Sequence, residues 1–373
     1  MNINLQNPMK NDSLWMNNTS SQSKQLVDPI INSTSSNKNI SFLKKLIGVL
    51  LNQESGDNPG NKSSPALKIN TLYTLLNNHE PDVASQRQAE NTRFDKLINH
   101  VIPASYSEQP KTSSTAEKSL DNIRGDVAKK LSFVRDTVRD DQLHTQKNYS
   151  IFTTAIRKEV SQAKAEESRT GIDVNTSYAE LWARVAIAIG GIKKDYVDFY
   201  ADLMITYTSM YEKFNETVQK AAGEAITSGK DGNTIKFDKN IMEKGWRDFD
   251  TWVNAQQFGS VPGWENMSSE QKAEMTGTLE PAYKVDQNGK ISFNLDQYNA
   301  SLKLPTTTGE ISTTAYQAWL ASFNALGSSF QSNMQSFAQR YSQANSTFDN
   351  LNKVLSGVIS TLADSAKQVL KSL

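Results

Sequence analysis

The chain contains no cysteine, which excludes disulfides, thiolate nucleophiles and cysteine-based zinc or iron–sulfur sites. Histidine is almost as scarce, because His79, His100 and His144 are too few and too widely spaced for a familiar zinc motif. Ions bound by carboxylates stay open. Neither sign of charge is in excess, since 40 Lys and Arg residues balance 40 Asp and Glu residues. The overall charge therefore gives no indication of a nucleic-acid partner or an anionic membrane.

Long apolar runs are also missing from the sequence. The longest candidate, 185–192, is far shorter than the roughly 18 residues that a membrane-spanning helix needs. No basic segment followed by an apolar one opens the chain, so no cleaved secretory signal is predicted. Hydrophobic residues make up 37%, a low share that favours an elongated helical shape, a disordered segment or both. Residues 1–38, rich in Asn and Ser, are predicted to be disordered.

Apolar residues at helical spacing begin at Ile40 and predict an N-terminal helical domain. Three short stretches show this spacing between turn-forming segments: 40–53, 66–78 and 83–101. A much longer helix is predicted from about 116 to 165. Its apolar stripe stops after Val138 and resumes at Tyr149.

Two further segments carry a coiled-coil seam, in which apolar residues alternate steps of three and four. The first seam comprises Trp182, Val185, Ile189, Ile192, Tyr196, Phe199, Leu203, Tyr207, Met210, Phe214 and Val218. The second comprises Tyr316, Trp319, Phe323, Leu326, Phe330, Met334, Phe337, Tyr341, Ala344, Phe348, Leu351, Leu355, Val358 and Leu362. Each contains a four–four step, a stutter that locally unwinds a supercoil. Helices of this length cannot fold back inside one core, so the two are predicted to pair as an antiparallel coiled coil.

Residues 223–312, between the two seams, have a different texture and predict a small mixed α/β domain. Strands are expected at 234–238, 282–286 and 290–294, with the Asn288-Gly289 pair in a tight hairpin turn. Short helices are expected at 241–258 and 268–278. Because this insertion connects two antiparallel helices, we expect it at one end of the coiled coil.

The sequence offers no catalytic or cofactor motif, since the familiar nucleophile, phosphate-loop, zinc-protease and dinucleotide patterns are all missing. Asp286 opens a segment that resembles part of a calcium loop but lacks the distal ligands, so a hairpin turn is favoured. Asp195, Asp198 and Asp202 share a helix face, and neighbouring Lys193 and Lys194 favour a solvated charged surface over a metal site. His144 is read as a surface or core-edge residue rather than a ligand. Trp246, Trp252 and Trp264 are expected in the core of the insertion rather than on a binding platform.

One stretch departs from an ordinary coiled coil. Arg340 is the only charged residue between Ile311 and Phe348, where the outer positions are Ser, Gln, Asn, Thr and Ala. Solvated helix faces normally carry many Glu and Lys residues, as the first seam helix does. A chargeless face can be covered by a partner at a lower desolvation cost, so we favour an assembly surface over compositional drift.

Several blocks resemble the needle-tip proteins of type III secretion systems, the invasin group of IpaD, SipD and BipD. The blocks are Glu180-Leu181-Trp182-Ala183, Tyr207-Thr208, Met210-Tyr211, the run GKDGNT at 229–234, AYQAW at 315–319, QRYSQANSTFDNL at 339–351, KVLS at 353–356 and Ile359-Ser360. Their order and spacing cover about 178–370. Residues 40–168 depart from the family pattern and are longer than expected.

The resemblance implies a mainly α, elongated dumbbell with a central antiparallel coiled coil, an N-terminal helical hairpin domain and a small distal mixed α/β domain. The corresponding segments are 1–38 (disordered, with the export signal), 39–170 (self-chaperone-like domain), 178–222 (first coiled-coil helix), 223–312 (insertion) and 313–373 (second coiled-coil helix and C-terminus). In such proteins the hairpin masks the coil before secretion.

The implied function is that of a secreted, non-enzymatic needle cap without a cofactor, cytoplasmic before export and then at the bacterial surface. It would bind the needle subunit, assemble into a ring, commonly a pentamer, and recruit translocators on host contact. A bile salt is a further candidate ligand, because some relatives sense one between hairpin and coil.

By its match to the family's C-terminal block, the resemblance assigns the needle-facing or subunit-facing role to Asn345, Asp349, Asn350 and Lys353. The residues assigned to the coiled-coil seam are Trp182, Ile189, Tyr196, Leu203, Phe323, Phe337, Phe348 and Leu355. The main alternative is another secreted helical structural protein, such as a filament subunit or an adhesin stalk, which would polymerise without needle subunits. A pore-forming translocator is disfavoured by the missing apolar run.

Overall fold

The structure, a computed structural model, describes residues 45–50, 71–76, 114–170, 184–230, 233–301 and 309–372. These residues form two compact units. The first unit contains 45–50, 149–170, 184–190 and 352–372. The second contains 71–76, 114–148, 191–230, 233–301 and 309–351, and it holds the candidate site.

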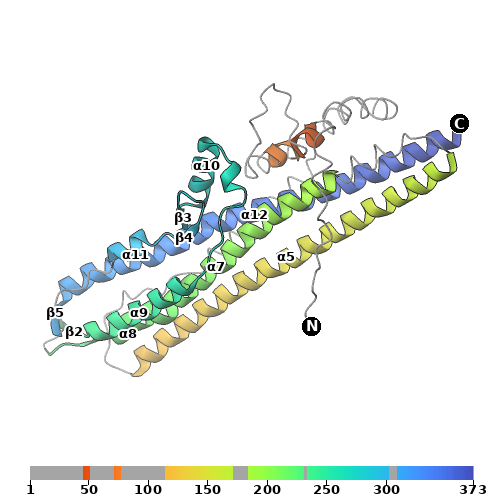
Figure 1. The fold of residues 1–373 in the computed structure, drawn as a ribbon. Helices are drawn as coiled ribbons and strands as arrows, with labels where there is room; N and C mark the ends of the chain where they lie inside the picture. Colours follow the sequence, from red (N-terminus) through yellow and green to blue (C-terminus); the bar gives the residue numbers. More distant parts are fainter. Residues whose placement is uncertain are drawn as a thin grey trace. The chain divides into compact units, whose positions relative to one another are not determined.

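Most of the described chain is helical (Figure 1). The helices are α5 (Ser114–Thr170), a segment at 184–192, α7 (Phe199–Phe214), α8 (Lys220–Glu224), α9 (Lys239–Ala255), α10 (Ser269–Leu279), α11 (Asp296–Ser301) and α12 (Thr313–Ser372). A 3₁₀ turn, η4, covers Trp264–Asn266. The long helices predicted near 116–165 and 313–370 are confirmed as α5 and α12.

Two π-helical turns interrupt the first seam helix: η2 (Lys193–Asp198) before α7 and η3 (Asn215–Gln219) after it. A π turn inserts one residue into a helix and so shifts the phase of everything that follows. This shift explains an error in the predicted seam. Phe199 is only half-buried, whereas Tyr200 is fully buried and packs its ring 5.4 Å from that of Phe337.

In the second unit, α7 and α12 run antiparallel. Three ring contacts fix this direction, because the partner number on α12 falls as the number on α7 rises: Tyr200–Phe337, Tyr211–Phe330 and Phe214–Phe323. The predicted antiparallel direction is therefore confirmed for α7 and α12. Helix α5 joins them as a third member, and the three lie side by side in Figure 1. It runs parallel to α12, since Val138 contacts Tyr341 and Asn148 contacts Asp349.

The strands form two small antiparallel sheets. The first has the order β1 (Ile226–Ser228), β2 (Thr234–Phe237) and β5 (Gly309–Ser312), and β5 leads directly into α12. The second is the hairpin of β3 (Tyr283–Val285) and β4 (Ile291–Phe293). The strand predicted at 234–238 and the Asn-Gly hairpin are confirmed. Gly289 has a φ of 80°, and a Cβ there would run into the ring of Trp264.

The helices of the insertion begin where side chains cap them. The Asp238 carboxylate accepts a hydrogen bond from the Asn240 amide at the start of α9 (2.9 Å). A capping box opens α10, because Ser268 and Gln271 each accept a hydrogen bond from the other's backbone amide. Both helices confirm the predictions at 241–258 and 268–278.

The insertion packs along the helices as well as at their end. Helix α9 runs back beside η3 and α8, with Gly245 against Ala221 (Figure 1). Helix α10 contacts α7 through Met275 and Tyr200, and strand β3 contacts α7 as well. The Tyr283 hydroxyl donates to the Leu203 carbonyl at 2.5 Å. Residues 191–351 therefore belong to one compact unit that includes the insertion. The reason is its aromatic core, which is shared with α7 and α12.

Several predictions lie outside the described residues, namely the disordered segment 1–38, the helix at 83–101 and Trp182. The described parts of two predicted N-terminal helices, 45–50 and 71–76, are helical. Among the residues that the structure describes, no helix is long and apolar enough to cross a membrane.

Candidate assembly site on the C-terminal helix

The predicted seam residues are buried wherever the structure describes them. This set comprises Ile189, Tyr196, Leu203, Phe323, Phe337, Phe348 and Leu355, none of them more than 6% exposed. Burial of the four that lie on α12, Phe323, Phe337, Phe348 and Leu355, stabilises the packing of this helix by roughly 1.5–3 kcal/mol for each. The seam therefore positions the polar residues that α12 carries between and beside its apolar ones.

The four predicted needle-facing residues differ in exposure. Asp349 is 9% exposed, Asn350 is 2% exposed, and Asn345 is half-buried. Lys353, beyond them on α12, is exposed. In this conformation, then, Asp349 and Asn350 lie inside the helix bundle, Asn345 is partly covered and Lys353 faces solvent.

Helix α5 covers this polar part of α12. The Thr145 hydroxyl lies 2.6 Å from the side-chain amide oxygen of Asn345, and the Asn148 side-chain amide donates to the Asp349 carboxylate at 3.0 Å. The exposed His144 has its Nε2 4.0 Å from Asp349 Oδ2. His144 is thus a surface residue beside Asp349, in line with the prediction of a surface or core-edge position. These α5 residues were not predicted as partners, but the gap in the apolar stripe between Val138 and Tyr149 marks their position.

A buried tyrosine closes the same contact one turn earlier on α12. The Tyr341 hydroxyl donates to the Val138 carbonyl of α5 at 3.4 Å. Burial raises the pKa of Tyr341, and the carboxylates of Asp141, Asp349 and Asp198 raise it further. The hydroxyl therefore stays protonated and remains a donor over the physiological pH range.

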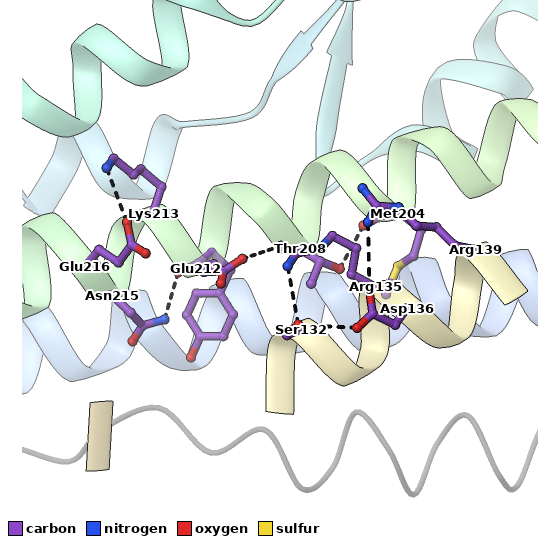
Figure 2. Close-up of polar contacts among 11 residues, drawn as sticks. Ser132, Arg135, Asp136, Arg139, Met204, Thr208, Glu212, Lys213, Asn215 and Glu216 are labelled. Atoms are coloured by element: carbon purple, nitrogen blue, oxygen red, sulfur yellow. Dashed lines mark hydrogen bonds and ion pairs between the residues drawn. The ribbon is translucent and has the colours of Figure 1, made fainter. Parts of the chain in front are cut away.

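Between α5 and α7 the contact is also polar (Figure 2). Arg135 of α5 forms an ion pair with Glu212 of α7, and each side chain is 21% exposed. Farther along, the Gln142 amide donates to the Asp202 carboxylate at 3.1 Å. Helix α5 thus buries apolar residues up to Val138. It also forms polar pairs with α7 and, beyond Val138, with α12.

The acidic face of the first seam helix contains a lysine–aspartate pair. The Lys193 ammonium donates to both carboxylate oxygens of Asp198, at 2.7 and 2.5 Å. The π turn permits this pairing, because five residues make up little more than one of its wide turns. The predicted solvated surface holds for exposed Lys194 and is wrong for Lys193, which is 7% exposed. No cluster of His, Asp and Glu suited to a metal occurs in the described part of the chain.

The aromatic residues of the insertion serve mainly as core. Trp246 and Trp264 are each 8% exposed, as predicted, and half-buried Trp252 stacks on Phe293. The Asp286 carboxylate accepts hydrogen bonds from the amides of Asn288 and Lys290, which confirms a turn. The Asp286 carboxylate therefore stabilises the hairpin turn.

The outer face of α12 is exposed where the sequence lacks charge. Small side chains occupy exposed positions in the first third of α12, at alternating steps of four and three residues: Thr314, Ala318, Ala321, Ala325, Ser328 and Ser332. We call this set the chargeless face. Another helix could approach such a surface closely, because neither long side chains nor charges oppose it.

Comparisons with known proteins show which family this sequence and fold belong to. A family model described as type III secretion systems tip complex components matches residues 78–256 and 300–370. The match begins about a hundred residues before the resemblance recognised in the sequence. It therefore corrects the impression that the region before 168 departs from the family throughout.

Three named relatives are similar over part of their length. Invasin IpaD of Shigella flexneri is 30% identical over 222 residues, 57% of this chain and 66% of the relative. Cell invasion protein SipD of Salmonella typhi is 30% identical over 52% of this chain and 62% of the relative. Translocator protein BipD of Burkholderia thailandensis is 28% identical over 48% and 54%. The chain thus spans less than two thirds of the length of these relatives.

A solved structure of BipD from Burkholderia pseudomallei shares the fold. It superposes with a TM-score of 0.51 at 20% identity and covers 76% of this chain and 99% of the BipD chain. At this identity the likeness concerns the arrangement of helices and strands.

Proposed function

Because this chain belongs to the family of type III secretion tip complex components, we propose that it caps the secretion needle, controls secretion and recruits translocators on host contact. It would be exported from the cytoplasm and act at the needle tip as a binding and assembly protein. The observation that carries the proposal is the family match, which includes α5, α7 and nearly all of α12. Relatives named invasins and a translocator protein support it.

The needle-facing or subunit-facing role belongs to Asn345, Asp349, Asn350 and Lys353 in this proposal. Since α5 covers the first two, a partner can reach them only after α5 moves away. This matches the self-chaperone role expected of the N-terminal domain. Polar contacts suit such an exchange, because a partner's amide or ammonium can replace the groups that Thr145 and Asn148 provide.

A chemical lock on α5 tests this step. The side chains of Gln142 and Asp202 meet, and the chain has no other thiol, so Gln142→Cys with Asp202→Cys can be joined by a short cleavable bismaleimide. We expect the joined protein not to bind purified needle subunits, and binding to return once the linker is cleaved. The same variant treated with a monofunctional maleimide is the control. Equal binding by joined and free protein would contradict masking by α5.

Self-association into a tip ring is assigned to the chargeless face. A neighbouring copy is the occupant we propose, because a face without charge can meet another protein surface without unpaired ions. A pentamer is the ring size implied by the resemblance. A bile salt is also a candidate ligand, supported only by the resemblance to the family. Calorimetric titration of the purified chain with a bile salt tests this.

Gene deletion tests the function as a whole. A strain without this chain should secrete translocators without control and fail to lyse host membranes, and both defects should be restored by the intact gene. Complementation with Asp349→Ala and Lys353→Ala together should leave both defects. Normal secretion and lysis in the deletion strain would sink the proposal and leave the filament or stalk alternative. A fully active double variant would sink only the assigned residues.

A further inference from the structure

Arg340, the single charge in its stretch of α12, is directed at the insertion. Its Nη1 donates to the Glu280 carbonyl at 3.4 Å, just after α10 ends. The guanidinium also acts on Tyr196 and Tyr200, because burial raises the pKa of each hydroxyl and Arg340 opposes that rise. The one cation on this part of α12 thus lies among the insertion, η2 and α7.

The same corner of the insertion is held at further points. We define the corner as residues 274–285, from late α10 through β3. The Tyr200 hydroxyl donates to the Met275 sulfur at 3.8 Å, and the ring of Phe337 lies 5.5 Å from that of Tyr283. Phe337 and Arg340 are three residues apart on α12, so both act from one helical face.

The next residue, Tyr341, contacts α5. Its hydroxyl donates to the Val138 carbonyl, and Asn345 and Asp349 continue the α5 contact over the following two turns. One turn of α12 therefore meets the corner with Arg340 and meets α5 with Tyr341.

We propose that Arg340 is a positioning residue that couples the corner of the insertion to α5. An α-helix turns as a rigid rod, so a rotation of α12 that draws Arg340 from Glu280 also moves Tyr341 relative to Val138. Displacement of the corner then loosens α5, and release of α5 loosens the corner, since coupling is reciprocal. The coupling is a property of the fold and does not depend on needle binding.

Amide hydrogen exchange on the full chain tests the coupling. In Arg340→Gln we expect residues 138–148 of α5 to exchange roughly threefold to tenfold faster, because the charge-assisted hydrogen bond from Arg340 to Glu280 is lost. Arg340→Lys should give an intermediate increase, since it keeps the charge without the planar fork. The matched control is Arg247→Gln, an exposed arginine on α9 whose loss should leave α5 unchanged.

Two results would overturn the inference. In one, exchange rises in the corner and stays the same in α5, which would make Arg340 a local anchor only. In the other, exchange rises equally in α5 and in the β1–β2 strands, which would indicate general destabilisation. In the double variant of Arg340→Gln and Tyr341→Phe, the fold increase in amide exchange of residues 138–148 should be smaller than the product of the two single-variant increases. The reason is that both changes relax one coupled contact.

Discussion

The amide of Asn148 on α5 donates to the carboxylate of Asp349 on α12 at 3.0 Å, where Asp349 is only 9% exposed. This contact joins two helices that lie two hundred residues apart in the sequence. It is also the place where the proposed needle-facing block is covered.

Asn148→Ala should lower the free energy of unfolding by about 1–2 kcal/mol, because a buried carboxylate loses a donor. Replacing both residues by leucine should cost less than the single change, since the carboxylate that loses its donor is then removed as well. Denaturant unfolding monitored by circular dichroism measures both. Asn254→Ala, at an exposed position on α9, is the control, expected within about 0.5 kcal/mol of the parent. A double variant less stable than the single one would contradict this account.

Gly245→Ala should destabilise the protein by about 1–3 kcal/mol, because the new methyl group would meet Ala221 and the Thr217 carbonyl, where α9 packs on η3 and α8. Gly277→Ala on α10 should instead stabilise by up to about 1 kcal/mol, since nothing lies within 4 Å and alanine favours the helix. Thermal unfolding distinguishes the two. Equal shifts for both variants would mean that the approach of α9 is looser than the structure shows.

Alkaline pH should unfold the protein cooperatively. Burial raises the pKa of Tyr316 to about 12, and it raises the pKa of Tyr207 and Tyr283 above the ordinary value near 10. The unfolded chain then releases these protons first, so the free energy of unfolding is steady below about pH 10 and falls as the pH rises to 12 and beyond. Tyrosinate absorbance should increase in step with loss of helical circular dichroism. A gradual increase that precedes unfolding would argue against buried hydroxyls.

Ala325→Glu should weaken self-association at least about tenfold, because it places an unpaired charge at the centre of the chargeless face. The stability of the single chain should change by less than about 0.5 kcal/mol, since the site is exposed and glutamate is a good helix former. Sedimentation velocity over a range of concentrations measures the association. Ala273→Glu, at an exposed position on α10, is the control. An unchanged association in Ala325→Glu would remove this face from the ring.

The spacing of apolar residues predicted the buried positions well in helices that have a single apolar stripe. The seam on α12 is buried at every predicted position from Tyr316 to Leu355, because a helix with one apolar stripe can bury it in only one way. The first seam was harder, since a π turn is set by packing and leaves no mark in the spacing. Phe199 was therefore predicted in place of Tyr200.

The candidate site was predicted only in part. The sequence indicated the block 345–353 on α12 by resemblance, and the gap in the α5 stripe marked where a polar layer lies. Thr145 and Asn148 could not be paired with Asn345 and Asp349, because hydrogen bonds between distant segments depend on helix register, which periodicity does not determine. The paired role of Lys193 was hidden for the same reason.

The sequence by itself determined the long helices, the hairpin turn, the chargeless face and the family. These depend on local spacing, turn chemistry and composition, which act within a few residues of one another. The tertiary structure decided that α5 joins the bundle, that the insertion packs along α7 and that the polar block of α12 is covered. Those outcomes depend on which surfaces meet across long stretches of chain, and the free energy of that choice comes from burial and pairing in three dimensions.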